Sequence, residues 1–323
     1  MSTVTYRTAT LDDAELAADL MTAAYPALPQ DPVILRLRWE RPRTGFAYGR
    51  FIAERDGGPI GYLGWIHGPW EKVPDRHCEV EVWVDQKHLD RELLIAMFTW
   101  IDDLASLEGS RLLMSYCAED EPEMLDSLAA LGYKRERIER CSELNLREHG
   151  DRLVADAKQA RDRLAGEGIE LATLARWKDP AALRRLWELS NLTAQDMPHT
   201  LPIIDEAYED FERRMHAPDR PHDRIWIALH DDQPVSMSYL KYPPVRGTVW
   251  TSYTCTHPAY RGRGLAKGVK LQGLAQAVEL GVPRVCTDND SENAPMLRIN
   301  QQLGYEPRPG FVEHHKRVTN QGA

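Results

Sequence analysis

Hydrophobic and polar positions alternate along this chain with two periods, one of about 3.6 residues and one of two. Leu16, Leu20 and Met21 follow the helical period, and the valines of 80–84 alternate as they do in a half-buried strand. An Asp56-Gly57 pair between two β-rich runs is typical of a hairpin turn. The first half of the chain is therefore predicted to mix strands and helices.

The same order of elements is predicted twice. The first half contains, in order, a strand (4–8), a helix (11–25), a hairpin (50–66), a strand (78–84), a helix (89–107), a strand (111–117), a short helix and a final pair of strands (132–146). The second half repeats the strand, helix, hairpin, strand and helix: 169–173, 180–192, 225–242, 248–256 and 264–280. An offset of 172 residues (303 minus 131) pairs Leu131-Gly132-Tyr133 with Leu303-Gly304-Tyr305. This self-similarity indicates a duplicated domain, with a helix-compatible linker at 148–167 between 1–147 and 168–323.

The length agrees with this organisation, because 323 residues exceed what one hydrophobic core usually supports. No apolar run approaches the roughly 20 residues that span a bilayer, so no membrane partner is expected. The N-terminus shows no basic segment followed by an apolar one, which favours a cytosolic protein. The net charge of −10 argues against nucleic-acid binding and would suit a cationic or amine substrate, although acidic surfaces often serve solubility alone.

The cysteines and histidines do not form a metal-binding pattern. Five widely spaced cysteines are an odd number without a CxxC pair, so we expect reduced, mostly buried thiols and no structural zinc. The pairs His314-His315 and His216/His222 lack further ligands at suitable spacing. No metal is therefore expected.

A glycine-bearing loop at the start of a predicted helix is the clearest chemical signal. Arg261-Gly262-Arg263-Gly264-Leu265-Ala266 follows the strand 248–256 and a proline-marked turn. Such a loop offers unpaired backbone N–H groups and the positive end of a helix to an anion. Gly262 and Gly264 remove the side chains that would otherwise block the ligand.

Arg261-x-x-Gly264-x-Ala266 resembles the diphosphate-binding motif of the GNAT acetyltransferase superfamily. A second resemblance lies in Cys286-Thr287-Asp288-Asn289, followed by Asn293, Met296, Asn300 and Leu303-Gly304-Tyr305, which look like the fifth strand and the next helix of that family. The resemblance implies an α/β protein with two tandem GNAT folds, each a central mixed twisted sheet flanked by helices. This organisation is distantly similar to that of mycothiol synthase. No sequence match is specific enough to predict the substrate of that enzyme for this chain.

The resemblance also implies the cofactor, acetyl-CoA or another short acyl-CoA, bound by the second half. Its pantetheine arm would lie between the fourth and fifth strands, which splay apart in this family. The residues implied in binding follow the strand, the glycine loop and the asparagine-rich segment: Thr254, Cys255, Thr256, Arg261, Gly262, Arg263, Gly264, Leu265, Ala266, Asn289, Asn293 and Asn300.

The first half lacks these features at the paired positions. Asp90 and Glu92 stand where the second half has Gly262 and Gly264. Carboxylates facing a diphosphate repel it by roughly 1 kcal/mol each at 4 Å in water, and by several times that near a protein surface. Cys117 and Glu121 likewise replace Asn289 and Asn293. Residues 1–147 are therefore predicted to be a degenerate copy that binds no acyl-CoA.

The resemblance implies direct attack of an amine on the thioester, which requires a base for the amine and an acid for the leaving thiolate. The strand 249–256 contains no carboxylate, and Asn300 stands where relatives commonly carry an acidic tyrosine. An amide is no general acid. By position, Tyr253 and Asp288 are the catalytic candidates, and a structural role for either is an open alternative.

The region 191–224 follows the first helix of the second half, where this fold usually selects its substrate. It is rich in acidic residues, and Asp196 and His199 are predicted to contact the acyl acceptor. The alternative is that 204–215 is an ordinary amphipathic helix with a solvated charged face.

Three functions are compatible with these patterns. The first is a monomeric or homodimeric cytosolic N-acetyltransferase of a small amine such as an antibiotic, an amino acid or an amino sugar. The second is an acetyl-CoA sensor without turnover, and the third is a protein lysine acetyltransferase. A complete phosphate loop favours the enzyme over the sensor, because the first half shows that a merely structural copy need not keep such a loop.

Overall fold

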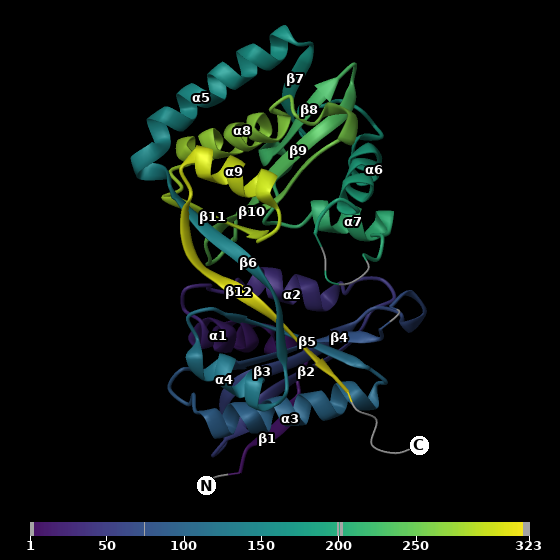
Figure 1. Cartoon of the computed structure of the whole chain (residues 1–323), viewed down its shortest axis with the longest axis vertical. Coiled ribbons are helices and arrows are strands. Elements are labelled where there is room, and N and C mark those ends of the chain that lie inside the picture. Colours follow the sequence, from purple (N-terminus) through teal and green to yellow (C-terminus); the bar gives the residue numbers. More distant parts are fainter. Residues whose placement is uncertain (1–2, 74, 199, 201–202, 319–323) are drawn as a thin grey trace. The chain divides into compact units, whose positions relative to one another are not determined.

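The computed structural model describes residues 3–73, 75–198, 200 and 203–318 (Figure 1). The chain divides into two compact units with similar plans. Unit 1 comprises Met1–Glu139, Pro244–Gly247 and Pro309–Ala323, and unit 2 comprises Arg140–Pro243 and Thr248–Arg308. Each unit is a mixed α/β structure with a sheet flanked by helices, which confirms the predicted fold class.

Unit 1 is built on the strand order β1-β2-β3-β4-β5-β12, in which only β4 and β5 run parallel. Its strands are β1 (Thr5–Thr8), β2 (Ala47–Arg55), β3 (Gly58–His67), β4 (His77–Val84), β5 (Leu112–Ala118) and β12 (Glu306–Arg317), the last from Pro309 onward. Its helices are α1 (Ala14–Ala24), α2 (Pro32–Glu40), α3 (Arg91–Leu107) and α4 (Pro122–Ala130), with 3-10 turns at Leu11–Asp13 and Trp70–Lys72.

Unit 2 repeats this plan with the strand order β6-β11-β10-β9-β8-β7. Its strands are β6 (Lys134–Asn145, from Arg140 onward), β7 (Ile169–Thr173), β8 (Ile225–His230), β9 (Gln233–Lys241), β10 (Val249–Thr256) and β11 (Arg284–Asp290). Its helices are α5 (Leu146–Gly166), α6 (Ala182–Ala194), α7 (Tyr208–Met215), α8 (Leu265–Glu279) and α9 (Ala294–Leu303), with 3-10 turns at His222–Arg224 and Pro258–Tyr260. Only β10 and β11 are parallel among its registered pairs.

Helices cover both faces of each sheet (Figure 1). In unit 1, one core lies under α1 and α2 and another under α3 and α4. In unit 2, α6 and α7 cover one core, whereas α5 and α8 cover the other face. Apolar burial on this scale, at roughly 25 cal/mol per Å², is the main stabilising term of both units.

The local turn chemistry agrees with the predicted hairpins. Asp56 and Gly57 have φ values of 53° and 78°, and Asp231 and Asp232 have φ values of 50° and 58°. Two successive left-handed residues are what a two-residue hairpin turn requires, and aspartate tolerates that conformation better than most residues. All five cysteines are unpaired and buried, which agrees with the expectation that the thiols are mostly buried.

Three predicted features differ from the structure. The expected pair of strands at 132–146 is the single strand β6, because no turn residue interrupts Lys134–Asn145. Helix α2 was not predicted; Asp31 caps it and Pro32 begins it. Two strands also cross the sequence halves, since β6 ends in unit 2 and β12 pairs with β5 in unit 1.

The segment 148–167, expected as a linker, forms most of helix α5 and packs on unit 2. Leu153 and Leu164 are fully buried there, and Gly150 lets α5 approach α8 so closely that a Cβ would lie 3.1 Å from Val278. Burying each leucine stabilises the unit by about 2 kcal/mol. Helix α5 is therefore part of the core of unit 2.

Asp31 connects two loops within unit 1 and should contribute strongly to its stability. Its side chain is 7% exposed and accepts hydrogen bonds from the backbone N–H groups of Val33, Ile34, Val245 and Arg246 at 2.7–3.0 Å. Asp31→Ala should destabilise the protein by about 2–4 kcal/mol, because it removes a helix cap and leaves buried donors without acceptors.

Urea unfolding measures this change. Asp31→Asn keeps one acceptor oxygen and should lie between the wild type and the alanine variant. A loss below about 0.5 kcal/mol for Asp31→Ala would show that solvent replaces these hydrogen bonds.

Candidate functional site

The central feature of unit 2 is an opening between two parallel strands. β10 and β11 pair only at Val249↔Val285 and Trp250↔Cys286, although β10 continues to Thr256 and β11 to Asp290. The register of β10 against β9 shifts between Thr251 and Tyr253, which is a β-bulge. A bulge bends and twists its strand, so β10 leaves β11 just after the last shared pair. This is the splay that the family resemblance implied.

Strand alternation turns backbone groups of β10 into this opening. The N–H of His257 donates to the carbonyl of Val235 at 2.8 Å, so this residue faces β9. The Cys255 carbonyl, two residues earlier, also lies on that side and accepts from the Ser236 hydroxyl at 2.6 Å. Neighbouring strand residues point their backbone groups in opposite directions. The N–H and C=O of Thr254 are therefore directed away from β9 and toward the opening.

The glycine loop follows β10 and ends at the start of α8. Gly262 and Gly264 have φ values of 76° and 77°, a left-handed conformation that disfavours other residues. Gly264 is the N-cap of α8, and the first N–H with a helical acceptor is that of Gly268, which donates to Gly264 at 3.0 Å. The N–H groups of the first helical turn have no such acceptor and are available to an anion.

Arginine side chains surround this loop, and one of them was not predicted. Arg163 of α5 donates to the Arg263 carbonyl at 3.2 Å, and its Nη2 would lie 2.9 Å from a Cβ at Gly264. Glu167 pairs with Arg163 at 2.5 Å and with Arg263 at 3.5 Å. The sequence contained no local signal for Arg163, because it belongs to a generally charged helix and only packing brings it to the loop.

Asp196, predicted to contact the acyl acceptor, forms an ion pair with Arg261 of the glycine loop at 2.5 Å. Arg261 also donates through Nε to the Thr256 carbonyl at 3.2 Å. Both charged side chains are about half exposed, so the pair contributes at most about 1 kcal/mol to stability. His199, the other predicted acceptor contact, lies outside the described residues.

Other acidic residues of 191–224 are likewise paired with arginines. Glu206 binds Arg214 through two hydrogen bonds of 2.8 and 2.7 Å, and Arg214 donates to the Tyr239 hydroxyl at 2.5 Å. Asp210 pairs with Arg213 on helix α7. The helix of the alternative interpretation is present but shorter, since α7 begins at Tyr208 and not at Ile204. Its charged face is not fully solvated, because Asp210 is 8% exposed.

The three asparagines have different roles. Asn300 of α9 donates through Nδ2 to Asn289 of β11 at 2.6 Å, and its own Oδ1 has no hydrogen-bond partner among the described residues although the residue is 3% exposed. Asn293 accepts from the Met296 N–H at 3.3 Å and caps α9. Asn293 therefore has a structural role that the sequence argument did not recognise, whereas Asn300 keeps a buried acceptor for a ligand N–H.

The two catalytic candidates lie in different surroundings. The Tyr253 hydroxyl is 3.1 Å from the Thr193 hydroxyl and 3.4 Å from the Ser190 carbonyl of α6, and burial raises its pKa. The Asp288 side chain is open to solvent, but protein surrounds its other sides, and this desolvation raises its pKa while Lys241 and Lys270 oppose the shift. Asp288, with its solvent exposure and raised pKa, is thus a better candidate than Tyr253 for a proton acceptor.

Lys270 of α8 is a buried titratable residue that the sequence analysis did not identify. It is 3% exposed, and burial lowers its pKa to about 7, while the charge of Asp288 opposes this shift. Its Nζ lies 5.4 Å from the centre of the Tyr305 ring. The available signal was its position one helical turn before Leu274, in the apolar stripe of the predicted helix.

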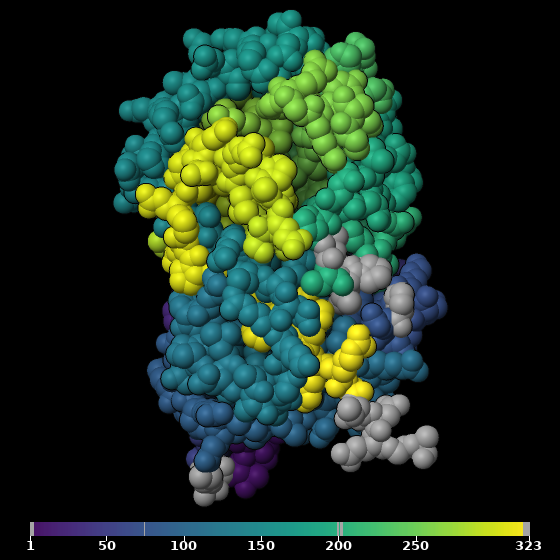
Figure 2. Space-filling model, viewed as in Figure 1, coloured from purple at the N-terminus to yellow at the C-terminus, as the bar shows by residue number. Residues whose placement is uncertain are grey.

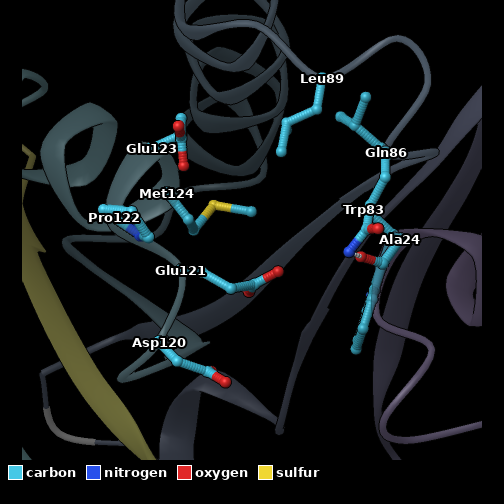
Figure 3. Close-up of a pocket in the computed structure, with 10 residues that line it drawn as sticks. Ala24, Trp83, Gln86, Leu89, Asp120, Glu121, Pro122, Glu123 and Met124 are labelled. Atoms are coloured by element: carbon cyan, nitrogen blue, oxygen red, sulfur yellow. Dashed lines mark hydrogen bonds between the residues drawn. The ribbon is translucent and has the colours of Figure 1, made fainter.

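Unit 1 contains a comparable opening with different chemistry. β4 and β5 pair only from His77↔Leu112 to Glu79↔Met114 and then separate. A pocket of about 140 Å³ lies beyond this point, and its ten lining residues include three carboxylates and no Lys or Arg (Figure 3). Burial, and next the charge of Asp120, raises the pKa of Glu121 in this pocket to about 7.

The helix start beside this opening is also occupied. Asp90 caps α3 and accepts the Leu93 N–H at 2.7 Å, so the protein's own carboxylate uses a donor that a phosphate would need. This helix begins at Arg91, two residues earlier than the register of α8 implies (265 minus 172 is 93). The anion site of unit 2 therefore has no open counterpart in unit 1.

Comparison with known proteins agrees with this geometry. Residues 186–305 match the model of a family described as the acetyltransferase (GNAT) family. A tandem GNAT protein from the clavulanic acid biosynthesis pathway, solved without AcCoA, superposes with a TM-score of 0.78 at 19% identity, over 99% of this chain and 100% of that one. A GCN5-related N-acetyltransferase from Sphaerobacter thermophilus gives 0.66 at 16% identity, over 97% and 95%.

A GNAT-family acetyltransferase from Colwellia psychrerythraea gives a TM-score of 0.60 at 10% identity, over 98% of this chain and 100% of that one. At these identities the solved structures establish a shared fold. No curated protein matches the sequence significantly. Among the described residues, no helix is both long and apolar enough to cross a bilayer.

Lys270→Met tests the cost of burying the amine at this site. The folded-state pKa of about 7 lies below the ordinary 10.5, so the unfolded chain binds more protons between these pH values and stability rises with pH. The loss of folding stability that comes from burying Lys270 is fully present below about pH 7 and absent above about pH 10.5. The methionine variant should therefore be more stable than the wild type by a few kcal/mol at pH 6, and this advantage should shrink toward pH 10.

Urea unfolding across this pH range measures the difference. Lys267→Met is the control, because Lys267 reaches the surface of the same helix and contacts Gln302 at 3.2 Å. A pH-independent difference between wild type and Lys270→Met would contradict the burial of a neutral amine.

Proposed function

We propose that unit 2 is an acetyl-CoA-dependent N-acetyltransferase of a small amine. The proposal starts from the match of residues 186–305 to the model of the acetyltransferase (GNAT) family and from the fold that the chain shares with a tandem GNAT protein. Enzymes of this family are N-acyltransferases. The proposal assigns acyl-CoA binding and chemistry to unit 2 alone. The acceptor would be a small molecule with a primary amine, such as an antibiotic, an amino acid or an amino sugar.

The main support for this proposal is that an opening between two strands and a glycine loop adjoin each other in unit 2. The opening between β10 and β11 leads into the loop Arg261–Gly264, where backbone N–H groups at the start of α8 are free of helical acceptors. The pantetheine arm of acyl-CoA carries amides and ends in a diphosphate. Its amides could pair with the exposed edge of β10, and its diphosphate could bind the N–H groups at the start of α8. Figure 2 shows the surface of unit 2 hollowed between the yellow residues of α9 and the neighbouring green residues.

The proposed binding residues divide by the part of acyl-CoA that they would hold. The glycine loop and the first turn of α8, from Arg261 to Ala266, would bind the diphosphate, with Arg163 adding positive charge. Thr254 would offer its N–H and C=O to the pantetheine amides, and the free Oδ1 of Asn300 would accept an N–H. When bound, acyl-CoA supplies an activated thioester.

The acyl acceptor would enter from the side of Asp288. An amine must be neutral to attack, and the raised pKa of Asp288 makes its carboxylate a stronger base for the amine proton than an ordinary aspartate. A backbone N–H in the opening would polarise the thioester carbonyl as charge develops on oxygen. Tyr253 remains a candidate acid, although its hydroxyl is hydrogen-bonded toward α6.

Unit 1 would contribute no second acyl-CoA site. Three carboxylates line its pocket, and Asp90 already occupies the start of α3. A diphosphate placed there would meet like charges at a cost of roughly 1 kcal/mol or more for each. One acyl-CoA per chain is therefore expected.

Calorimetric titration with acetyl-CoA tests this proposal. The wild type should bind one molecule per chain, and Gly264→Glu should weaken binding by about 100-fold or more, because it places a carboxylate at the anion site. Gly281→Glu is the matched control, since Gly281 is also left-handed, with φ of 74°, and follows the C-terminal end of the same helix in open space.

Each result of the titration leads to a different conclusion. Normal binding by Gly281→Glu shows that backbone strain alone does not explain the loss in Gly264→Glu. Two molecules per chain would refute the assignment to unit 2 alone. No binding by the wild type would refute the acetyltransferase proposal.

A further inference from the structure

The strongest unexplained feature is the buried amine of Lys270 beside the opening of unit 2. One direct contact and two neighbouring interactions locate it. The Tyr305 ring lies 5.4 Å from its Nζ, and the Tyr305 hydroxyl is 3.3 Å from the hydroxyl of Thr251, the first residue of β10 beyond the last pair with β11. Asp288, two residues beyond that pair on β11, acts on Lys270 electrostatically. Lys270 thus lies where the two strands begin to separate.

Lys270 is 3% exposed, and its Nζ contacts the ring of Tyr305. Burying an ammonium is costly, and the charge of Asp288 compensates only in part. Burial lowers the pKa of Lys270 to about 7, so a large share of the side chains is neutral at physiological pH. A neutral, desolvated lysine amine is a nucleophile.

We propose that Lys270 is a site of self-acylation, at which the acyl group of an acyl-CoA bound to unit 2 is transferred to the lysine Nζ. This inference rests on the proposed function, because it requires the thioester to lie in the opening. The reaction is the one that the site performs on an external amine, with an amine of the protein itself as the acceptor. A donor bound in the opening beside Lys270 would favour this lysine over lysines of the surface.

The step balances without a further reactant. The lone pair of Nζ forms a bond to the carbonyl carbon, the carbon–sulfur bond breaks, and its electron pair leaves on sulfur. The nitrogen loses one proton, which Asp288 or water accepts, and the thiolate gains one to become free CoA thiol. The product is an amide, which is not an activated acyl group, so acylated Lys270 is an end product that fills the opening rather than an intermediate of turnover.

The groups that set the pH dependence come from three elements. Asp288 of β11 acts on the amine electrostatically, Tyr305 just before β12 contacts it, and Lys241 of β9 acts on Asp288. Since only the neutral amine attacks, the rate of self-acylation should rise with pH through about 7, where half of the amine is neutral, and level off above the pKa.

Peptide mass spectrometry after incubation with acetyl-CoA tests the proposal. Lys270 should gain one acetyl group at least about tenfold faster than Lys267, the neighbouring lysine on the surface of the same helix. The rate should saturate with acetyl-CoA concentration, as binding does. It should fall in Gly264→Glu and persist in Gly281→Glu.

Calorimetry on the same samples distinguishes a failure of the self-acylation proposal from a failure of the proposed function. Binding of acetyl-CoA without acetylation of Lys270 would overturn the self-acylation site and leave the proposed function standing. Acetylation at equal rates on Lys267 and Lys270, without saturation, would show chemical acylation only and would also overturn it. Failure of acetyl-CoA to bind would refute the proposed function itself.

Discussion

The functional features of unit 2 depend on one departure from regular sheet pairing, the separation of β10 from β11 after Trp250↔Cys286. A parallel pair normally satisfies the inner backbone groups of both strands. The bulge at Thr251–Tyr253 bends β10 away, and the groups beyond it are left facing an opening. Unsatisfied backbone at the edge of a buried opening is costly unless water or a ligand binds it, so the strand geometry itself implies an occupant.

Unit 1 follows the same plan with different side chains at the corresponding positions. Its strands β4 and β5 separate in the same way, but carboxylates line the space, and Asp90 caps the helix that would otherwise bind an anion. A side-chain cap contributes about 1 kcal/mol to the helix. At this position unit 1 therefore has a stabilising helix cap where unit 2 has an open helix start, within the same fold.

Much of the architecture was readable from the sequence because it follows from local rules. The hairpin turns need residues that tolerate a positive φ, and Asp56-Gly57 and Asp231-Asp232 supply them. The Gly262 and Gly264 pair marked the anion loop for the same reason. Helix α2 and the unbroken strand β6 were missed, since neither carries a strong periodic signal.

The sequence by itself determined the duplicated α/β plan, the glycine loop and the acidic replacement of that loop in the first half, because each depends on residues close together in the chain. Only the tertiary structure decided which distant side chains meet at the loop. It brought Arg163 to Gly264 and paired Asp196 with Arg261. It also buried Lys270 where β10 and β11 part, because desolvation and charge at a site arise from packing between elements, which no local pattern encodes.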